Sequence, residues 1–94
     1  MDPRTGWTFL SNHAHVLITL SAQRDLRIRD LARIVGITER AVAQILVDLE
    51  AAHVLTKIKD GRRNFYEIDG NVPLRHQVES HRFVKDILRL AAKR

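Results

Sequence analysis

Two amphipathic helical patterns that follow one another almost without spacing constrain the fold of this chain most. In the first pattern, apolar residues lie three, four and seven positions after Ile28, on one face of an α-helix. Gly36 follows and suits the left-handed conformation that often ends a helix. Thr38 is a good N-cap for a second helix, whose apolar stripe is Val42, Ile45, Leu46 and Leu49. A turn of about two or three residues between them predicts a helix-turn-helix over about residues 29–52.

The hydrophobic period changes directly after this helix pair. The segments VLTKIK and NFYEI are rich in β-branched and aromatic residues, and DGRR joins them. Asp60-Gly61 is a strong signal for the turn of a β-hairpin. We therefore expect a two-stranded wing over about residues 54–68.

The flanking segments complete the predicted order. NHAHVLITLSAQ has helical apolar spacing and follows a candidate N-cap at Ser11 or Asn12, while residues 26–28 alternate enough for a very short strand. Pro73 suits the first turn of a long last helix over about residues 72–92. The order helix, strand, helix, helix, hairpin, helix (α-β-α-α-β-β-α) predicts a mainly α winged helix-turn-helix with a small β-hairpin.

Length and composition exclude several classes of protein. The 94 residues suggest a single domain, 1–94, and the absence of cysteine excludes disulfide frameworks and thiolate metal sites. The sequence has no apolar run of about 18 residues that could span a membrane, and its first residues lack the organisation of a signal peptide. We therefore expect a cytoplasmic protein with no membrane partner.

Positive charge is concentrated in blocks. The formal net charge is +5, and basic residues outnumber acidic ones in residues 24–40, 57–63 and 75–94. A small basic domain is biased toward nucleic acid or other anionic surfaces. A solvated, soluble surface is the alternative explanation of such blocks.

The outward face of the second helix of the pair carries the candidate reading residues. If the apolar stripe is buried, Glu39, Ala43 and Gln44 face outward together with Arg40. Thr38 and Arg40 suit phosphates, while Arg40 can also pair with guanine and Gln44 with adenine. Ala43 is small enough to approach a thymine methyl group, and Glu39 either accepts from cytosine or stabilises the helix N-terminus. The alternative is a plain helical hairpin inside a bundle.

Basic residues at the hairpin form the second candidate contact. Arg62 and Arg63 lie at or just beyond the turn, and Lys57 and Lys59 lie on the incoming strand. Two arginines on a projecting hairpin can straddle phosphates or enter a minor groove. We add Arg29 as a flanking contact. The alternative is a charged edge that prevents strands of different molecules from pairing.

The terminal segments carry apolar residues that the core of a winged helix does not need. We expect them to form a two-fold interface, so that the chain is a homodimer. The predicted interface residues are Trp7, Phe9, Leu10, Phe83, Val84, Ile87, Leu88 and Ala91. The alternative is that the last helix folds back on the core of its own chain.

The histidines and serines do not form a recognisable metal or catalytic pattern. His13 and His15 are two residues apart on a predicted helix and face different directions, and His76 and His81 are a poor chelating pair. The serines lie in no nucleophile elbow, and the sequence contains no glycine-rich phosphate loop. We therefore expect no enzyme activity, no metal site and no cofactor.

The segment RDLARIVGITERAVAQILVDLEAAHVLTKIKDGRRNFYEI, residues 29–68, resembles the winged helix-turn-helix of MarR/ArsR-type transcriptional regulators. The pieces DLA, VGITERAV, DLE and GRRNFY stand in the order that such regulators show. The resemblance implies homodimers held by terminal helices, with the second helix in the major groove and the wing on the flanking backbone or minor groove. It places the helix residues Thr38, Arg40, Ala43 and Gln44 and the wing residues Arg62 and Arg63 at DNA.

These observations together predict a sequence-specific regulator that binds double-stranded DNA as a homodimeric repressor. Two other functions remain open. One is a sequence-tolerant, chromatin-like DNA-binding protein, and the other is a protein-interaction module on a winged-helix scaffold. The chain lacks the cysteine pair of the metal-sensing regulators, and whether a small-molecule effector exists stays open.

Overall fold

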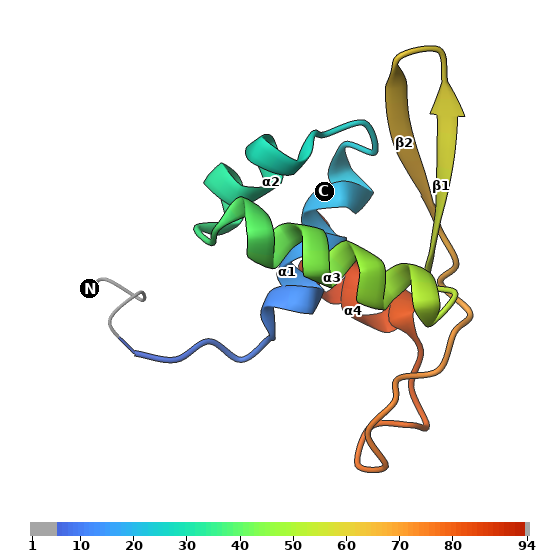
Figure 1. The fold of residues 1–94 in the computed structure, drawn as a ribbon. Helices are drawn as coiled ribbons and strands as arrows, with labels where there is room; N and C mark the ends of the chain where they lie inside the picture. Colours follow the sequence, from blue (N-terminus) through green and yellow to red (C-terminus); the bar gives the residue numbers. More distant parts are fainter. Residues whose placement is uncertain (1–5, 94) are drawn as a thin grey trace.

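The segments with strong helix and hairpin signals form the elements that those signals predict. The structure, a computed structural model, describes residues 6–93 (Figure 1). Within this range it contains four helices and one two-stranded antiparallel sheet: α1 (Asn12–Ala22), α2 (Ile28–Val35), α3 (Glu39–Ala51), β1 (Leu55–Asp60), β2 (Arg63–Ile68) and α4 (Val84–Ala91). None of these helices is long and apolar enough to cross a membrane.

Local caps set the ends of the helix pair. Gly36 ends α2 with φ 86° and ψ 34°, a left-handed conformation that glycine adopts without steric cost. Thr38 Oγ1 accepts a hydrogen bond from the Ala41 N–H at 3.0 Å and so caps α3. Ser11 caps α1 by accepting the Ala14 N–H at 3.2 Å, which decides between the two candidate caps of that helix.

The hairpin is anchored in the core at its base, and its tip lies outside the core. β1 and β2 pair in antiparallel register around a turn at Gly61, where φ is 65°. Near the base, Leu55 and Tyr66 are buried in the core. Near the tip, Lys59 lies opposite Asn64, and both residues are exposed. The wing therefore projects from the body next to the C-terminal end of α3 (Figure 1).

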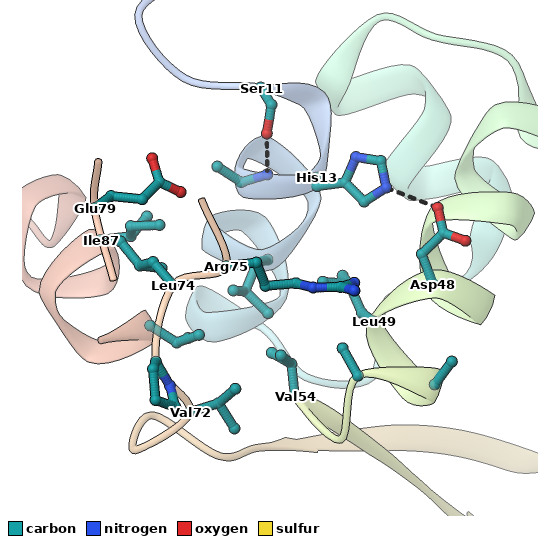
Figure 2. A pocket seen from close by; sticks show the side chains of 16 residues that line it. Ser11, His13, Asp48, Leu49, Val54, Val72, Leu74, Arg75, Glu79 and Ile87 are labelled. Atoms are coloured by element: carbon teal, nitrogen blue, oxygen red, sulfur yellow. Dashed lines mark hydrogen bonds and ion pairs between the residues drawn. The ribbon is translucent and has the colours of Figure 1, made fainter. Parts of the chain in front are cut away.

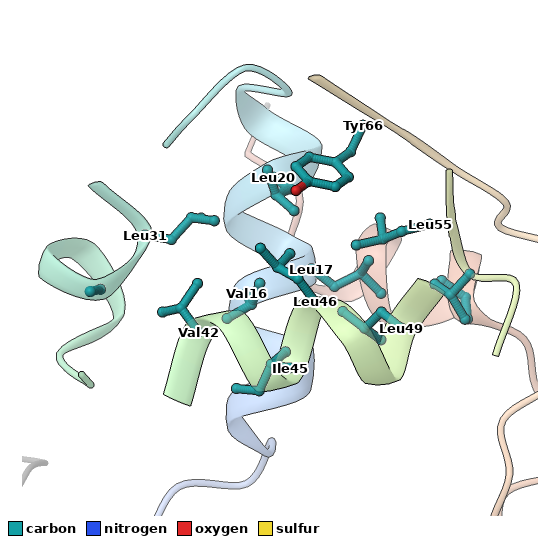
Figure 3. Packing of buried hydrophobic residues seen from close by; sticks show 13 residues of the cluster. Val16, Leu17, Leu20, Leu31, Val42, Ile45, Leu46, Leu49, Leu55 and Tyr66 are labelled. Carbon is teal, nitrogen blue, oxygen red and sulfur yellow. The ribbon is translucent and has the colours of Figure 1, made fainter. Parts of the chain in front are cut away.

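One hydrophobic cluster receives side chains from each helix and from both strands. Val16 and Leu20 of α1, Leu31 of α2 and Val42 of α3 are fully buried. Figure 3 shows the stripe of α3 directed toward α1, with Leu55 and Tyr66 closing the cluster from the wing. The predicted stripe of α3 therefore lies inward, and the opposite face of this helix is left for solvent or a partner.

The very short strand predicted at residues 26–28 does not form. The Asp30 carboxylate accepts the Arg27 N–H at 3.2 Å and begins α2 at residue 28. This hydrogen bond also holds the pKa of Asp30 below its usual value. A hydrogen bond from the Tyr66 N–H to the Arg24 carbonyl, at 3.2 Å, joins the wing to the turn between α1 and α2.

The last helix is much shorter than the predicted range of residues 72–92. α4 begins after Phe83, whose N–H donates to the Asp86 carboxylate at 2.8 Å. Pro73 and Phe83 form an isolated β-bridge, and the residues between them make a loop of turns that projects from the body (Figure 1). Val78 is the only apolar residue in positions 75–82 and is 73% exposed, so no stripe holds this segment on the core as a helix.

Candidate nucleic-acid interface

The outward face of α3 presents the predicted reading residues in its first two turns. Thr38, Glu39, Arg40 and Gln44 are exposed, and Ala43 is half-buried between them. The Thr38 oxygen is used to cap the helix, but its hydroxyl proton is still available to an outside acceptor. The structure thus brings the five residues together on one helix end, in the arrangement that their spacing predicts.

Gln44 is held by a carboxylate that reasoning from the sequence assigned no role. Gln44 Nε2 donates to Asp48 Oδ1 at 2.9 Å, one helical turn further along α3. The other oxygen, Asp48 Oδ2, lies 2.8 Å from His13 Nε2 on α1 (Figure 2). The side chains of His13 and Asp48 are 48% and 42% exposed, so this bridge lies at the surface and not in the core. We call His13, Asp48 and Gln44 the α1–α3 bridge.

The charge state of Asp48 follows from these contacts. Hydrogen bonds from His13 and then from Gln44 hold the pKa of the Asp48 carboxyl below its usual value, and the positive charge of Arg75 acts in the same direction. The Gln44–Asp48 half of the bridge has a sequence signal, because residues four apart on a helix are neighbours. The His13–Asp48 half has none, because the two residues are 35 positions apart.

The predicted basic residues of the wing differ in how free they are. Lys57, Lys59 and Arg62 are exposed, as is Arg29 on α2. Arg63, in contrast, forms an ion pair with Asp25 in the turn between α1 and α2. The arginine is therefore already paired in the unbound chain, and Asp25 is a neighbour that the sequence did not indicate.

A cleft of about 750 Å³ lies between the wing and the start of α2. Arg27, Lys57 and Arg62 contribute positive charge to its walls, and Asp25 and Asp30 contribute negative charge. Lys57 lies opposite Tyr66, which is buried, so its side chain stands on the core side of the hairpin and leans along this cleft. Three basic residues of the wing, Lys57, Arg62 and Arg63, thus border the cleft.

The predicted dimer residues divide into exposed and buried groups. Trp7 and Phe9 are 74% and 91% exposed, and their rings meet edge to face at 4.7 Å. Val84 is only 4% exposed and lies in the core of its own chain, so its assignment to the interface is wrong. Its N–H donates to the Val72 carbonyl at 2.9 Å, which directs the first turn of α4 against the body.

The other predicted interface residues lie between these two groups in their exposure to solvent. Leu88 packs against the core cluster, and Ile87 and Ala91 are half-buried. Phe83 is 36% exposed, while Leu90, which was not predicted at the interface, is 75% exposed. Leu10 is half-buried at the start of α1. The alternative of a helix that folds back on its own chain therefore describes the inner face of α4.

A cavity of about 380 Å³ lies where α1, the end of α3 and α4 meet (Figure 2). Leu49, Val72 and Leu74 line its apolar side, and His13 and Asp48 lie at its polar edge. Among residues 6–93, no three histidine or carboxylate side chains converge in a way that could hold a metal ion. The α1–α3 bridge therefore borders a cavity whose walls are mainly apolar.

Comparisons with known proteins point to transcriptional regulators. No protein-family model matches the chain, and no curated protein matches it in sequence. The PcaV transcriptional regulator from Streptomyces coelicolor is similar over 63% of this chain and 46% of its own, with 27% identity and a TM-score of 0.54. The same regulator in complex with its natural ligand gives 27% identity and a TM-score of 0.55, over 64% of this chain and 45% of its own.

The adhesin competence repressor AdcR from Streptococcus pyogenes is similar over a longer range. It matches 93% of this chain and 57% of its own, with 23% identity and a TM-score of 0.62, and this likeness concerns the fold. A structure of AdcR in the zinc-bound state, described as a zinc-dependent MarR family regulator, has a TM-score of 0.51 at 24% identity over 68% of this chain. The chain spans about half the length of these structures.

These similarities confirm the predicted winged-helix fold and agree with the resemblance to MarR-type regulators, since one of the similar structures is described as a MarR family regulator. The similar proteins are described as a transcriptional regulator and a repressor, which agrees with the prediction that the chain is not an enzyme.

Proposed function

We propose that this chain binds double-stranded DNA in a sequence-specific manner as a transcriptional regulator. The observation that supports this most is the outward face of α3, where Arg40, Ala43 and Gln44 stand exposed or half-exposed on a helix whose other face is buried. A B-DNA major groove is about 12 Å wide and admits such a helix. The basic wing next to the end of α3 then meets the flanking backbone or the minor groove.

The side chains divide into base-reading and phosphate-binding groups. Gln44 pairs with adenine, Arg40 pairs with guanine, and Ala43 leaves room for a thymine methyl group. Thr38, Arg29 and the wing residues Lys57, Lys59, Arg62 and Arg63 act on the backbone, because hydroxyl and cationic groups at a helix start or a hairpin suit phosphates. Glu39 accepts from cytosine or stabilises the first turn of α3.

We further propose that the chain acts as a homodimeric repressor. Trp7, Phe9 and Leu90 expose apolar surface at the terminal segments, and aromatic residues such as the first two are enriched at protein interfaces. A two-fold axis would place two copies of α3 roughly 34 Å apart, one turn of DNA. The expected binding site is therefore a pseudo-palindrome with two half-sites.

Selection of bound duplexes from a random pool at near-physiological salt tests this function. A symmetric enriched motif supports sequence-specific binding by a dimer, and sedimentation of the complex gives the number of chains. Binding that depends strongly on salt without any enriched motif would instead favour the chromatin-like function. Weak, salt-insensitive affinity for every duplex would favour a protein-interaction module.

A further inference from the structure

We infer that Asp48 and His13 are positioning residues that set the base preference of Gln44. This inference rests on the proposed function, because it concerns how one residue of the reading face is prepared for DNA. Neither Asp48 nor His13 is one of the residues proposed to contact the bases. Their effect passes through the amide of Gln44, which Asp48 binds at 2.9 Å.

The carboxylate determines which end of the amide faces it. An ionised carboxylate only accepts hydrogen bonds, so the NH₂ end of Gln44 is turned toward Asp48. An aspartate is ionised at neutral pH, and the hydrogen bonds that lower the pKa of Asp48 act in the same direction. Gln44 therefore has one N–H engaged, and its Oε1 and second N–H remain for a partner.

The remaining groups match one base better than the others. An acceptor beside a donor complements adenine, which presents its N6 amino group and N7 in the major groove. Guanine presents two acceptors there, N7 and O6, and leaves the Gln44 Oε1 without a donor. A fixed amide thus favours adenine over guanine at the position that Gln44 reaches.

His13 anchors the carboxylate from a separate helix. Its Nε2 lies 2.8 Å from Asp48 Oδ2, while Gln44 uses Oδ1, so each oxygen has its own partner. A free glutamine side chain would lose several rotamers on binding a base, and restraint before binding reduces that cost. Because α1 packs beside α3 in the core, the bridge fixes the position of the Gln44 amide relative to the body of the fold and not only to its own helix.

Removal of Asp48 has two effects on DNA binding, the loss of its negative charge and the loss of its hold on Gln44, and the two can be distinguished. A carboxylate on a helix at the major groove repels phosphates, so removal of the charge alone favours every duplex. Loss of positioning acts in another way, because it changes the ratio between duplexes that differ at one base. That ratio is the quantity that the experiment measures.

The experiment uses the full chain and the duplex selected from the random pool. Gln44→Ala first identifies the base position that this residue reads. Four duplexes, one with each base pair at that position, are then titrated with the wild-type chain and with Asp48→Ala. We expect Asp48→Ala to lower the ratio of affinities for adenine over guanine by about three- to tenfold. Affinity for the non-adenine duplexes should stay equal or rise.

Glu50→Ala is the matched control. It removes one negative charge from the same helix, and Glu50 forms no hydrogen bond with Gln44 in the structure. We expect this variant to keep the wild-type ratio. Asp48→Asn retains an acceptor oxygen for the amide and should keep more of the ratio than Asp48→Ala. His13→Ala should lower the ratio in the same direction as Asp48→Ala, because the carboxylate loses its anchor.

A double-mutant cycle completes the test. In the Gln44→Ala background, Asp48→Ala should leave the ratio unchanged, since the residue that it positions is gone. An equal loss of affinity on all four duplexes would show a purely structural role and overturn the inference. So would an unchanged ratio in both Asp48→Ala and His13→Ala. If the wild-type chain selects no duplex at all, the proposed function itself fails, and that result is obtained before any variant is made.

Discussion

Arg63 near the tip of the wing forms an ion pair with Asp25, which lies in the turn between α1 and α2. The two residues are far apart along the chain, and the pair closes one side of the cleft between the wing and the start of α2. The partner of Arg63 in the unbound chain is therefore a carboxylate, and phosphate has to compete with it.

Release of Arg63 should strengthen contacts with the DNA backbone. Asp25→Asn removes the competing charge, so we expect higher affinity for all duplexes and a salt slope that is steeper by about one. The measurement is the binding constant as a function of salt concentration. Glu67→Gln is the control, because it removes a carboxylate from the exposed side of β2. If the two variants have the same salt slope, Arg63 gains no phosphate contact when Asp25 is neutralised.

Substitution of a base-reading residue and substitution of a phosphate-binding residue should change DNA binding in different ways. Gln44→Ala should cost about 1–3 kcal/mol at one base position and relax specificity there. Arg62→Ala, at the exposed wing, should weaken binding to all sequences and flatten the salt slope by about one. Titrations of the selected duplex and of its single-base variants at several salt concentrations distinguish the two. A uniform loss with both substitutions would contradict the assignment of Gln44 to the bases.

The turn between α2 and α3 should depend on the backbone of Gly36 and not on its size. A Cβ at this position meets nothing within 4 Å, but φ is +86°. We therefore expect Gly36→Ala to lower the free energy of unfolding by about 1–2 kcal/mol, the cost of a left-handed conformation. Gly36→Asn should cost less, because asparagine tolerates this conformation. Denaturant unfolding of both variants checks this, and equal costs would point to another cause.

Substitutions at Val84 and Leu90 should affect the stability of the single chain and the association of two chains differently. Val84→Ala removes buried methyl groups from the core, so we expect the free energy of unfolding to fall by about 2 kcal/mol. Leu90→Ala removes a side chain that is 75% exposed, and it should leave the stability of the single chain almost unchanged while weakening a dimer. Denaturant unfolding at low concentration and sedimentation equilibrium give the two quantities. A large loss of single-chain stability in Leu90→Ala would place this residue in the core.

The α1–α3 bridge should be visible in the titration of Asp48. Its pKa is expected below the ordinary value of 3.8, first because of the hydrogen bond from His13. Since the folded-state pKa is depressed, the bridge contributes stability above pH 3.8 and loses it as the pH falls through the folded-state pKa. The carboxyl ¹³C shift of Asp48 reports the midpoint, which should rise in His13→Ala. An unmoved midpoint would mean that His13 does not bind Asp48 in solution.

The part of this structure that the sequence predicts depends on neighbours a few positions apart. Gly36 and Thr38 mark the turn of the helix pair, Asp60-Gly61 marks the hairpin, and the stripe from Val42 to Leu49 shows which face of α3 is buried. Each of these signals acts through backbone geometry or helical period within about two turns. The outward position of the reading residues follows from the same stripe.

Contacts between distant segments were decided only by the tertiary structure. His13 meets Asp48 because α1 and α3 pack on the same core, and Asp25 meets Arg63 because the wing folds back beside the turn after α1. Val84 is buried because a bridge between residues 73 and 83 brings the start of α4 against the body. Local periodicity carries no information on such partners, since a polar side chain on a helix surface is compatible with many of them. The sequence by itself thus determined the elements and the buried face of α3, while packing determined what holds Asp48 and Arg63 in place.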